Sequence, residues 1–332
     1  MLNSDCFYCC PVTHKPLRRE AGKFVSSSGD CYYIEEGIPD FTYPQELTGI
    51  CLDQKRYYDQ AADDYDRVAH LTFTIQNEDE TAVRQRFVDL LRLSPEDRVL
   101  EISCGTGRDS VIIADRLGSS GKLHLQDISK KMLLQAVAKL RSARVPVDAC
   151  AGNACYLPFP DRHFDAAYSF GGLSVFGDIK RALSEMVRVV RPGGRIVVGD
   201  ESMAPWLYET EFGRILLNNN PLFQAKVPLE AIPSQAREVT LRWVIGGVYY
   251  LIDFTVGEGE PSGQFDLAIP GRRGGTLNTR FYGKLEGVTA ATKEMVHQAA
   301  DKAGKSLHQW LDETLRAAAQ QGLNRVGEPK QP

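Results

Sequence analysis

The chain has 332 residues, of which 43% are hydrophobic and 25% charged, and its formal net charge is −4. This composition supplies enough apolar side chains for a full core and is typical of one or two globular domains. The net acidic balance argues against a broad surface for nucleic acid or anionic lipid. No apolar run approaches the roughly 20 residues needed to cross a bilayer, so we expect no membrane partner.

Residues 1–44 form the first region and hold four of the eight cysteines. The opening residues lack the basic and apolar segments of a signal peptide, and eight cysteines in this length do not suggest a disulfide framework. We therefore expect a reduced, cytoplasmic protein. Cys6 and Cys9 have the two-residue gap of a zinc knuckle, with Cys10, His14 and Cys31 nearby.

The middle of the chain alternates apolar strand patterns with helical stripes, which predicts a parallel sheet with helices on both faces. Strands are expected over 98–103, 122–127, 147–151, 164–170 and 195–199. Two further strand-like runs, 239–245 and 248–256, are separated only by Gly246 and Gly247, which indicates a hairpin. The predicted fold is an α/β, doubly wound, mainly parallel seven-stranded sheet.

The strongest motif, VLEISCGTGRD over 99–109, runs from a predicted strand through a glycine turn into a helix. Glycines here let a ligand approach the backbone, and the N–H groups that begin the helix suit a carboxylate. Asp127 ends the next strand 20 residues after Gly107, where a carboxylate can accept both hydroxyls of a ribose. A nicotinamide-binding domain is the alternative, but Ser110 stands in place of the third fingerprint glycine.

This motif resembles motif I of the methyltransferase type 11 group, which includes quinone-biosynthesis and small-molecule methyltransferases. Further segments resemble that group in order and spacing: 57–66, 152–161, 164–170 and 190–195. The resemblance implies a class I methyltransferase domain over 54–256 that uses S-adenosylmethionine (SAM) and releases S-adenosylhomocysteine. The chain departs from the pattern at Ser103, Cys104 and Asn153.

The resemblance also implies which residues bind SAM. They are Tyr57, Tyr65, Glu101, Ser103, Gly105, Gly107, Arg108, Asp127, Ile128, Asn153, Ala154, Ser169 and Phe170. The catalytic base stays open, with Tyr65, His70, Asp200 and Glu201 as candidates. Substrate contacts are expected from 170–176 and from an insert at 203–233, whose aromatic residues favour a small, partly apolar acceptor.

The first region also resembles the short zinc-ribbon modules that are fused to, or partner with, some RNA methyltransferases. The matching stretches are 10–17 and 33–41. Thr13 replaces the second cysteine of that pattern, and Ser27 and Ser28 lie where the third belongs, so we expect a ribbon without metal. A rewired site using Cys6, Cys9, Cys10, His14 or Cys31 is the alternative.

The end of the chain is expected to hold a Gly-rich loop and a strand at 257–288, a helical hairpin at 289–321 and a disordered tail at 322–332. Residues 296–311 resemble the helix pair of ribbon-helix-helix antitoxins, with 280–284 as the strand. That strand carries little basic charge, so dimerisation or packing is favoured over DNA binding.

Three functions compete at this point. The first is methyl transfer to an O, N or C nucleophile of a small, partly apolar molecule. The second is methylation of RNA or protein, suggested by the ribbon-like first region. The third is a SAM-binding regulatory protein that contacts DNA through the helix pair.

Overall fold

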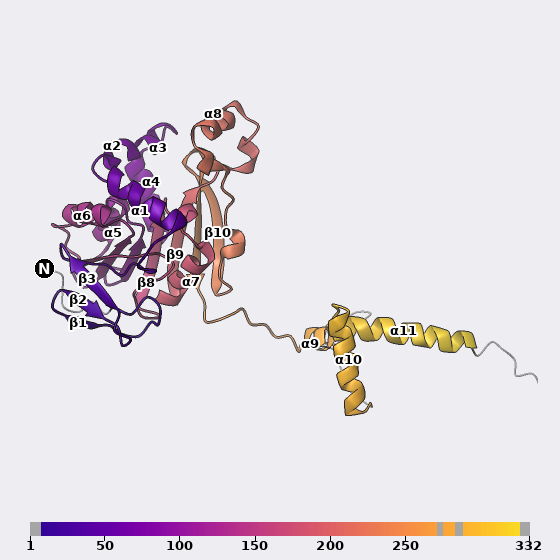
Figure 1. Ribbon diagram of the computed structural model, residues 1–332. Helices are drawn as coiled ribbons and strands as arrows, with labels where there is room; N and C mark the ends of the chain where they lie inside the picture. Colours follow the sequence, from indigo (N-terminus) through magenta and orange to yellow (C-terminus); the bar gives the residue numbers. More distant parts are fainter. Residues whose placement is uncertain (1–7, 271–274, 283–287, 326–332) are drawn as a thin grey trace, which may run out of the picture. The chain divides into compact units, whose positions relative to one another are not determined.

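The computed structural model describes residues 8–270, 275–282 and 288–325. The chain divides into two compact units, residues 1–261 and 262–332, and Figure 1 shows the elements of each. In the described ranges, no helix combines the length and the apolar character needed to span a membrane.

The first unit is built on a seven-stranded sheet with the order β10-β11-β9-β8-β5-β6-β7. Neighbouring strands from β9 to β7 are parallel, whereas β11 is antiparallel to both β9 and β10. The predicted mainly parallel seven-stranded sheet is confirmed. The strands are β5 (Arg98–Ile102), β6 (Lys122–Asp127), β7 (Val147–Ala151), β8 (Phe164–Phe170), β9 (Val190–Glu201), β10 (Ala236–Val244) and β11 (Tyr249–Val256).

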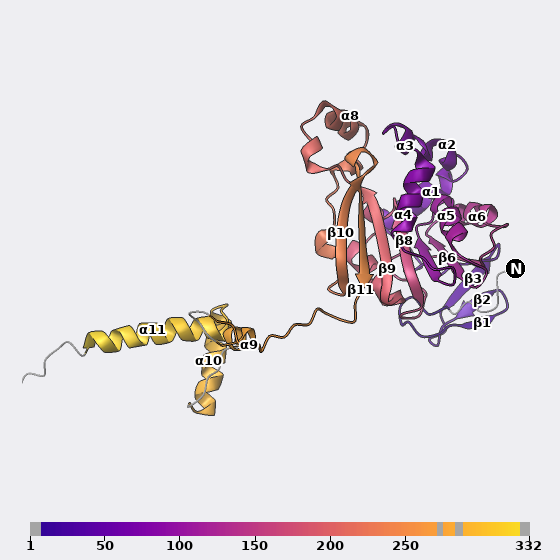
Figure 2. The same cartoon turned by 180° about the vertical axis from the view of Figure 1, so that it is seen from behind.

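The strand order sets the place of the site. The chain runs from β5 outward through β6 and β7, then returns to β8 on the other side of β5. This reversal opens a crevice at the carboxyl ends of β5 and its neighbours, where open α/β sheets bind ligands. In Figure 2, which shows the sheet from behind, β10 and β11 lie at one edge, far from β6.

Helices cover both faces of this sheet. Buried side chains of α3, α4, α5 and α6 form one core, and those of α7 form the other together with the first region. Ser129 caps α6 by accepting the Met132 N–H at 3.2 Å. The helices are α1 (Gly49–Ala61), α2 (Tyr65–Ala69), α3 (Leu71–Thr74), α4 (Glu80–Asp89), α5 (Arg108–Arg116), α6 (Lys130–Lys139), α7 (Ile179–Val189) and α8 (Glu211–Asn219).

The first region is a small antiparallel sheet, here called the N-terminal module (residues 8–44). Its strands are β1 (Arg18–Glu20), β2 (Lys23–Val25), β3 (Cys31–Glu35) and β4 (Ile38–Pro39). The Phe41 ring is fully buried and packs against the ring of Tyr8, with centroids 4.5 Å apart. The Phe41 N–H donates to the Ala151 carbonyl at 2.8 Å, and Asp40 forms a parallel bridge with Ala151. The module is therefore joined to the edge strand β7.

Strand β9 is longer than the predicted 195–199. It begins opposite Phe164, passes through a register shift around Gly193, whose φ is +81°, and continues to Glu201. The extension has a separate cause at each end, because Val190 pairs with Phe164 of β8 and β11 pairs with β9 up to Glu201. The predicted hairpin is present, with its turn at Ile245–Gly247.

The second unit contains α9 (Leu277–Tyr282), α10 (Ala290–Lys302) and α11 (Leu307–Arg325). The strand predicted at 280–284 is wrong over 280–282, which are helical, while 283 and 284 lie outside the described residues. The Thr276 hydroxyl accepts the Thr279 N–H at 3.1 Å and so starts a helix there. The predicted disordered tail is also wrong over 322–325, because α11 continues through Gly322 to Arg325.

Candidate functional site

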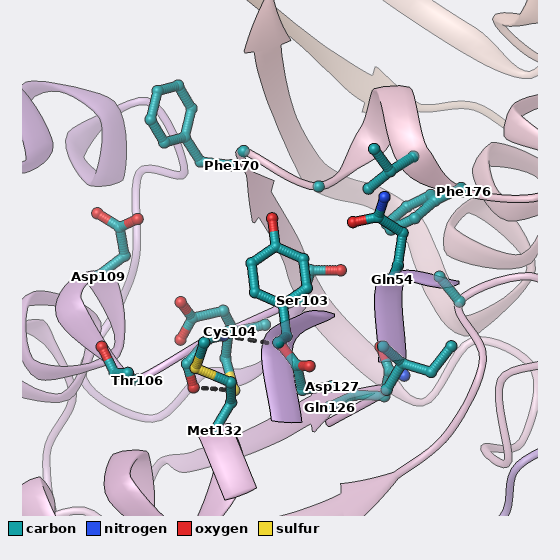
Figure 3. Close-up of a pocket in the computed structure, with 18 of the residues that line it drawn as sticks. Gln54, Ser103, Cys104, Thr106, Asp109, Gln126, Asp127, Met132, Phe170 and Phe176 are labelled. Carbon is teal, nitrogen blue, oxygen red and sulfur yellow. Dashed lines mark hydrogen bonds between the residues drawn. The ribbon is translucent and has the colours of Figure 1, made fainter. Parts of the chain in front are cut away.

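A cavity of about 860 Å³, counted with its open mouth, lies at the carboxyl ends of β5, β6, β7 and β8. The turns after these strands supply its floor, and Gln54 and Tyr58 of α1 with Tyr65 of α2 line it from the side of the preceding helices. Figure 3 shows Asp127, Gln126, Cys104 and Met132 gathered at this edge of the sheet. This is the crevice that the strand order requires.

The glycine turn after β5 shapes the floor of the cavity. Gly105 has a φ of +54°, and a Cβ built on it would meet no atom within 4 Å, so its position faces open space. Gly107 has a φ of +82°, and a Cβ there would lie 2.9 Å from the Cα and the Cβ of Ala136. Gly105 therefore leaves room for a ligand, whereas Gly107 lets α5 approach α6.

Asp127 is the buried carboxylate of the cavity. Its Oδ2 accepts the Gly105 N–H at 2.8 Å and its Oδ1 accepts the Ser129 N–H at 2.8 Å. Burial raises the pKa of this carboxyl to about 6, although the backbone N–H groups oppose that rise. Each oxygen keeps a second lone pair, so the group can accept two hydroxyl protons from a ribose.

A cluster of charges lies beside the start of α5. The Arg84 guanidinium donates to Asp109 at 2.6 Å and to Glu80 at 2.7 Å, and Arg108 donates to Glu80 and to Asp66. Within this cluster Arg84 and Arg108 both line the cavity. A carboxylate placed there would meet the arginines and the positive end of the α5 dipole.

Glu101 stands at the end of β5 and is fully enclosed. The Ser110 hydroxyl donates to its Oε2, and burial raises the pKa of the Glu101 carboxyl well above its usual value. Glu101 therefore lines the cavity as a buried carboxyl that is held by Ser110.

Asn153 is held on both sides of its amide. Its Nδ2 donates to the Tyr43 carbonyl of the N-terminal module at 3.1 Å, and its Oδ1 accepts the Cys155 N–H at 3.0 Å. One lone pair of Oδ1 remains for an adenine N–H. The loop that begins at Gly152 thus takes its shape partly from the module.

Most of the predicted cofactor residues come together in this cavity. Those that line it are Tyr65, Glu101, Ser103, Gly105, Arg108, Asp127, Ile128, Asn153, Ala154 and Phe170. Three others do not: Tyr57 has 61% of its side chain exposed, Gly107 packs on α6, and Ser169 is buried within β8. Tyr58, one residue on, faces the cavity in place of Tyr57.

The four candidate bases are dispersed. Tyr65 lines the cavity, whereas His70 is exposed and lies outside its lining. Asp200 is fully buried and accepts the Ser174 N–H at 2.5 Å and the Glu201 N–H at 2.8 Å. Glu201 is partly exposed and accepts the Tyr249 hydroxyl at 3.0 Å.

Several residues that line the cavity were not predicted from the sequence. Arg84 comes from α4, and Cys51 and Gln54 come from the face of α1 that also carries Tyr58. Their spacing of three and four residues is a helical signal that could have located this face. Gln126 Oε1 is buried and has no hydrogen-bond partner among the described residues, so it can accept a ligand N–H or O–H.

These groups fit SAM. Asp127 suits the ribose hydroxyls, the free Gln126 acceptor and Asn153 suit N–H donors of the adenine, and the arginines with the start of α5 suit the methionyl carboxylate. The open space over Gly105 leaves the backbone accessible to the cofactor between these groups.

Comparisons with known proteins find similarity to methyltransferases. Residues 99–194 match the family model described as a methyltransferase domain. The chain is 37% identical over 114 residues to the demethylmenaquinone methyltransferase of Bacillus licheniformis, covering 34% of this chain and 49% of that protein. It is 33% identical over 147 residues to the protein of the same name in Symbiobacterium thermophilum, covering 43% and 57%. The chain spans about half the length of these curated relatives.

Solved structures are more distant. Phosphoethanolamine N-methyltransferase 2 of Haemonchus contortus, in complex with SAM, is 12% identical, with a TM-score of 0.48 and coverage of 66% of this chain and 62% of that chain. The family model therefore gives the more direct indication: residues 99–194 match a methyltransferase domain, and the groups in the cavity fit SAM as its cofactor.

Proposed function

We propose that the protein transfers a methyl group from SAM to an O, N or C nucleophile of a small, partly apolar molecule, with a quinol related to demethylmenaquinone as the first candidate. The observation that carries this proposal is the position of Asp127 beside the open floor at Gly105, within a cavity whose wall at Phe170 continues into aromatic side chains. The partial match to demethylmenaquinone methyltransferases favours the quinol.

The chain's own residues bind and orient the reactants. When bound, SAM supplies a methyl group on a positively charged sulfur. Asp127, Asn153 and Arg84 would hold its ribose, adenine and carboxylate ends, which leaves the methyl group to point along a fixed direction. Holding both reactants in line lowers the entropic part of the barrier.

The acceptor side of the site is aromatic. The ring of Phe170 lies 5.0 Å from the ring of Phe87 and 5.6 Å from that of Tyr249, and Tyr249 lies 6.0 Å from Phe223 of the insert. Of these rings only Phe170 lines the cavity, and the buried rings behind it hold it in place. A flat, partly apolar acceptor would pack against Phe170 and would exclude water from the methyl group.

The direct test is methyl transfer from labelled SAM to three pools: reduced demethylmenaquinone, transfer and ribosomal RNA, and cell protein. We expect label in the quinol alone, and strongly reduced label with Asp127→Ala when SAM is supplied near the Kd of the wild type. Label in RNA or protein would instead support the second function considered from the sequence. Salt-sensitive binding to duplex DNA without any methyl transfer would support the third.

We also propose that the N-terminal module works without metal. Within the described residues no three His, Cys, Asp or Glu side chains are grouped as metal ligands. The Cys10 thiol lies 3.6 Å from the Tyr32 hydroxyl instead. Elemental analysis of protein purified without chelator should show no bound zinc, and one zinc per chain that is lost in Cys10→Ser would contradict this.

For the second unit we propose self-association of two chains. Leu315 is 61% exposed and Leu323 is 71% exposed on the same helix, α11, and such side chains favour a partner surface. Deleting 289–332 should convert a dimer into a monomer in light scattering. An unchanged mass would exclude this role.

A further inference from the structure

The ends of β9 and β11 present a paired acid and phenol. Glu201 and Tyr249 are direct partners in the antiparallel register, and the Tyr249 hydroxyl donates to Glu201 Oε1 at 3.0 Å. Tyr249 is only 6% exposed, whereas Glu201 is partly exposed. The phenol is therefore fixed by packing and holds one oxygen of the Glu201 carboxylate, which also contacts the carboxyl of the preceding residue, Asp200.

This pair lies next to the cofactor cavity. Phe170, which lines the cavity, is in register with Gly199 on the neighbouring strand, and Glu201 follows two residues later at the same edge of the sheet. A Cβ on Gly199 would lie 2.5 Å from Leu251 Cδ2 and from the Tyr250 carbonyl oxygen, and 3.0 Å from the Phe170 ring, so the glycine makes room for β11 and for this wall. Adjacent strands are about 4.8 Å apart, which puts Glu201 one strand beyond the wall.

The titratable groups around Glu201 are the Asp200 carboxyl and four phenols. Burial raises the pKa of the Asp200 carboxyl well above its usual value, and the contact with Glu201 adds to that rise. Burial likewise raises the pKa of four nearby phenols, which keeps them neutral at pH 7: Tyr58, Tyr65, Tyr249 and Tyr250. Asp200 is also occupied, because its oxygens accept backbone N–H groups of Ser174 and Glu201.

We propose that Glu201 is the catalytic residue that takes the proton of the methyl acceptor, and that Tyr249 is a positioning residue for its carboxylate. This rests on the proposed function. The X–H bond of the acceptor breaks and its proton goes to Glu201. The electron pair left on the acceptor forms the bond to the methyl carbon, and the pair of the carbon–sulfur bond leaves with the sulfur as S-adenosylhomocysteine.

The other candidates fit this role less well. His70 is exposed, whereas Glu201 is partly buried and accepts the Tyr249 hydroxyl, and Asp200 is enclosed by its own hydrogen bonds. Tyr65 lines the cavity, but burial raises the pKa of its phenol. The phenol therefore stays protonated at neutral pH and cannot take up the proton of the acceptor. Glu201 combines partial exposure with a fixed orientation.

The test uses the full-length protein with SAM and reduced demethylmenaquinone as the probe acceptor. Glu201→Gln should lower the transfer rate at pH 7 by about 10²–10⁴-fold, as for loss of a general base. Its affinity for SAM in calorimetry should stay within about twofold, because Glu201 is not among the residues that line the cofactor cavity. Glu96→Gln, at an exposed acid in the turn before β5 and outside both the cavity lining and the insert, is the matched control and should change neither quantity.

Two further variants separate catalysis from structure. Glu201→Asp keeps the charge and should recover part of the rate, which also covers the case in which Glu201→Gln does not fold. Tyr249→Phe should move the midpoint of the pH–rate profile upward, because the lost hydrogen bond had favoured the ionised carboxylate. A purely structural role would lower the rate at all pH values without moving that midpoint.

Infrared titration of the S-adenosylhomocysteine complex gives a readout that needs no turnover. The carboxylate band that disappears in Glu201→Gln should be ionised at pH 7 and should shift in Tyr249→Phe. A rate in Glu201→Gln within threefold of the wild type would overturn the proposal, as would a protonated Glu201 in the infrared titration. If the wild type methylates none of the acceptors, the proposed function fails and the infrared result still decides whether Glu201 can accept a proton.

Discussion

Replacing Asp127 with asparagine tests whether the cavity binds SAM through a charged ribose contact. Asp127 is buried, and its pKa is raised to about 6. Ribose hydroxyls donate to the ionised form, so binding favours ionisation, and the affinity for SAM should fall as the pH drops through 6. The asparagine cannot titrate, so its affinity should not change between pH 5 and 7.

The size of the effect follows from these numbers. At pH 5 about one Asp127 in ten is ionised if its pKa is about 6, so the apparent Kd of the wild type should rise about tenfold relative to high pH. At pH 7 the substitution removes a hydrogen bond to a charged group, worth about 1.5–3 kcal/mol, which corresponds to a roughly 10–150-fold weaker Kd. The α-amino group of SAM stays mostly protonated over this range, because such groups have pKa values near about 8.

Calorimetric titration with SAM at pH 5, 6 and 7 measures both effects. Asp115→Asn, at an exposed position on α5, is the control and should behave as the wild type. A wild-type Kd that is the same at pH 5 and 7 would refute the reasoning, and so would an asparagine variant that keeps the pH dependence.

Other consequences of the structure can be measured directly. Gly107→Ala should lower the free energy of unfolding by about 1–3 kcal/mol in urea, because its Cβ would meet Ala136 at 2.9 Å. Gly22→Ala, with a φ of +73° but open space, should cost less, and equal losses would contradict the steric argument. Phe41→Ala should cost about 3–5 kcal/mol in a single unfolding transition, whereas a separate early transition would show that the N-terminal module folds apart from the sheet. Deleting 262–332 should leave the Kd for SAM within twofold, and a tenfold loss would contradict the division into two units.

The sheet was largely predictable from the sequence. The runs at 122–127, 147–151 and 164–170 coincide with β6, β7 and β8, because buried parallel strands read as short apolar runs bounded by turns. The extension of β9 from 199 to Glu201 could not be predicted, since it depends on pairing with β11 about fifty residues later in the chain. Local sequence also favoured a strand at 280–282, where the cap at Thr276 starts a helix.

The site was predictable where it lies close to the glycine turn and less so elsewhere. Tyr57 and Tyr58 are adjacent, and only the packing of α1 decides which of them faces the cavity, because neighbours on a helix point about 100° apart. The contact between Asn153 and the Tyr43 carbonyl joins segments 110 residues apart. Arg84 has no local motif, since its role depends on meeting Asp109 across two helices.

The place of β11 between β10 and β9 also has a consequence for synthesis of the protein. Strands β5 to β8 can pair once about 170 residues have left the ribosome, but β9 keeps one bare edge until residue 256 follows. At about 5–20 residues per second, that edge is exposed for several seconds. The unpaired backbone groups of such an edge strand can pair with strands of other chains. A nascent chain that stops between 201 and 249 would therefore lack β11, so the edge of β9 would stay unpaired and the chain would be prone to aggregate. It would also lack Tyr249, the phenol that orients Glu201, so it would be inactive even if it stayed in solution.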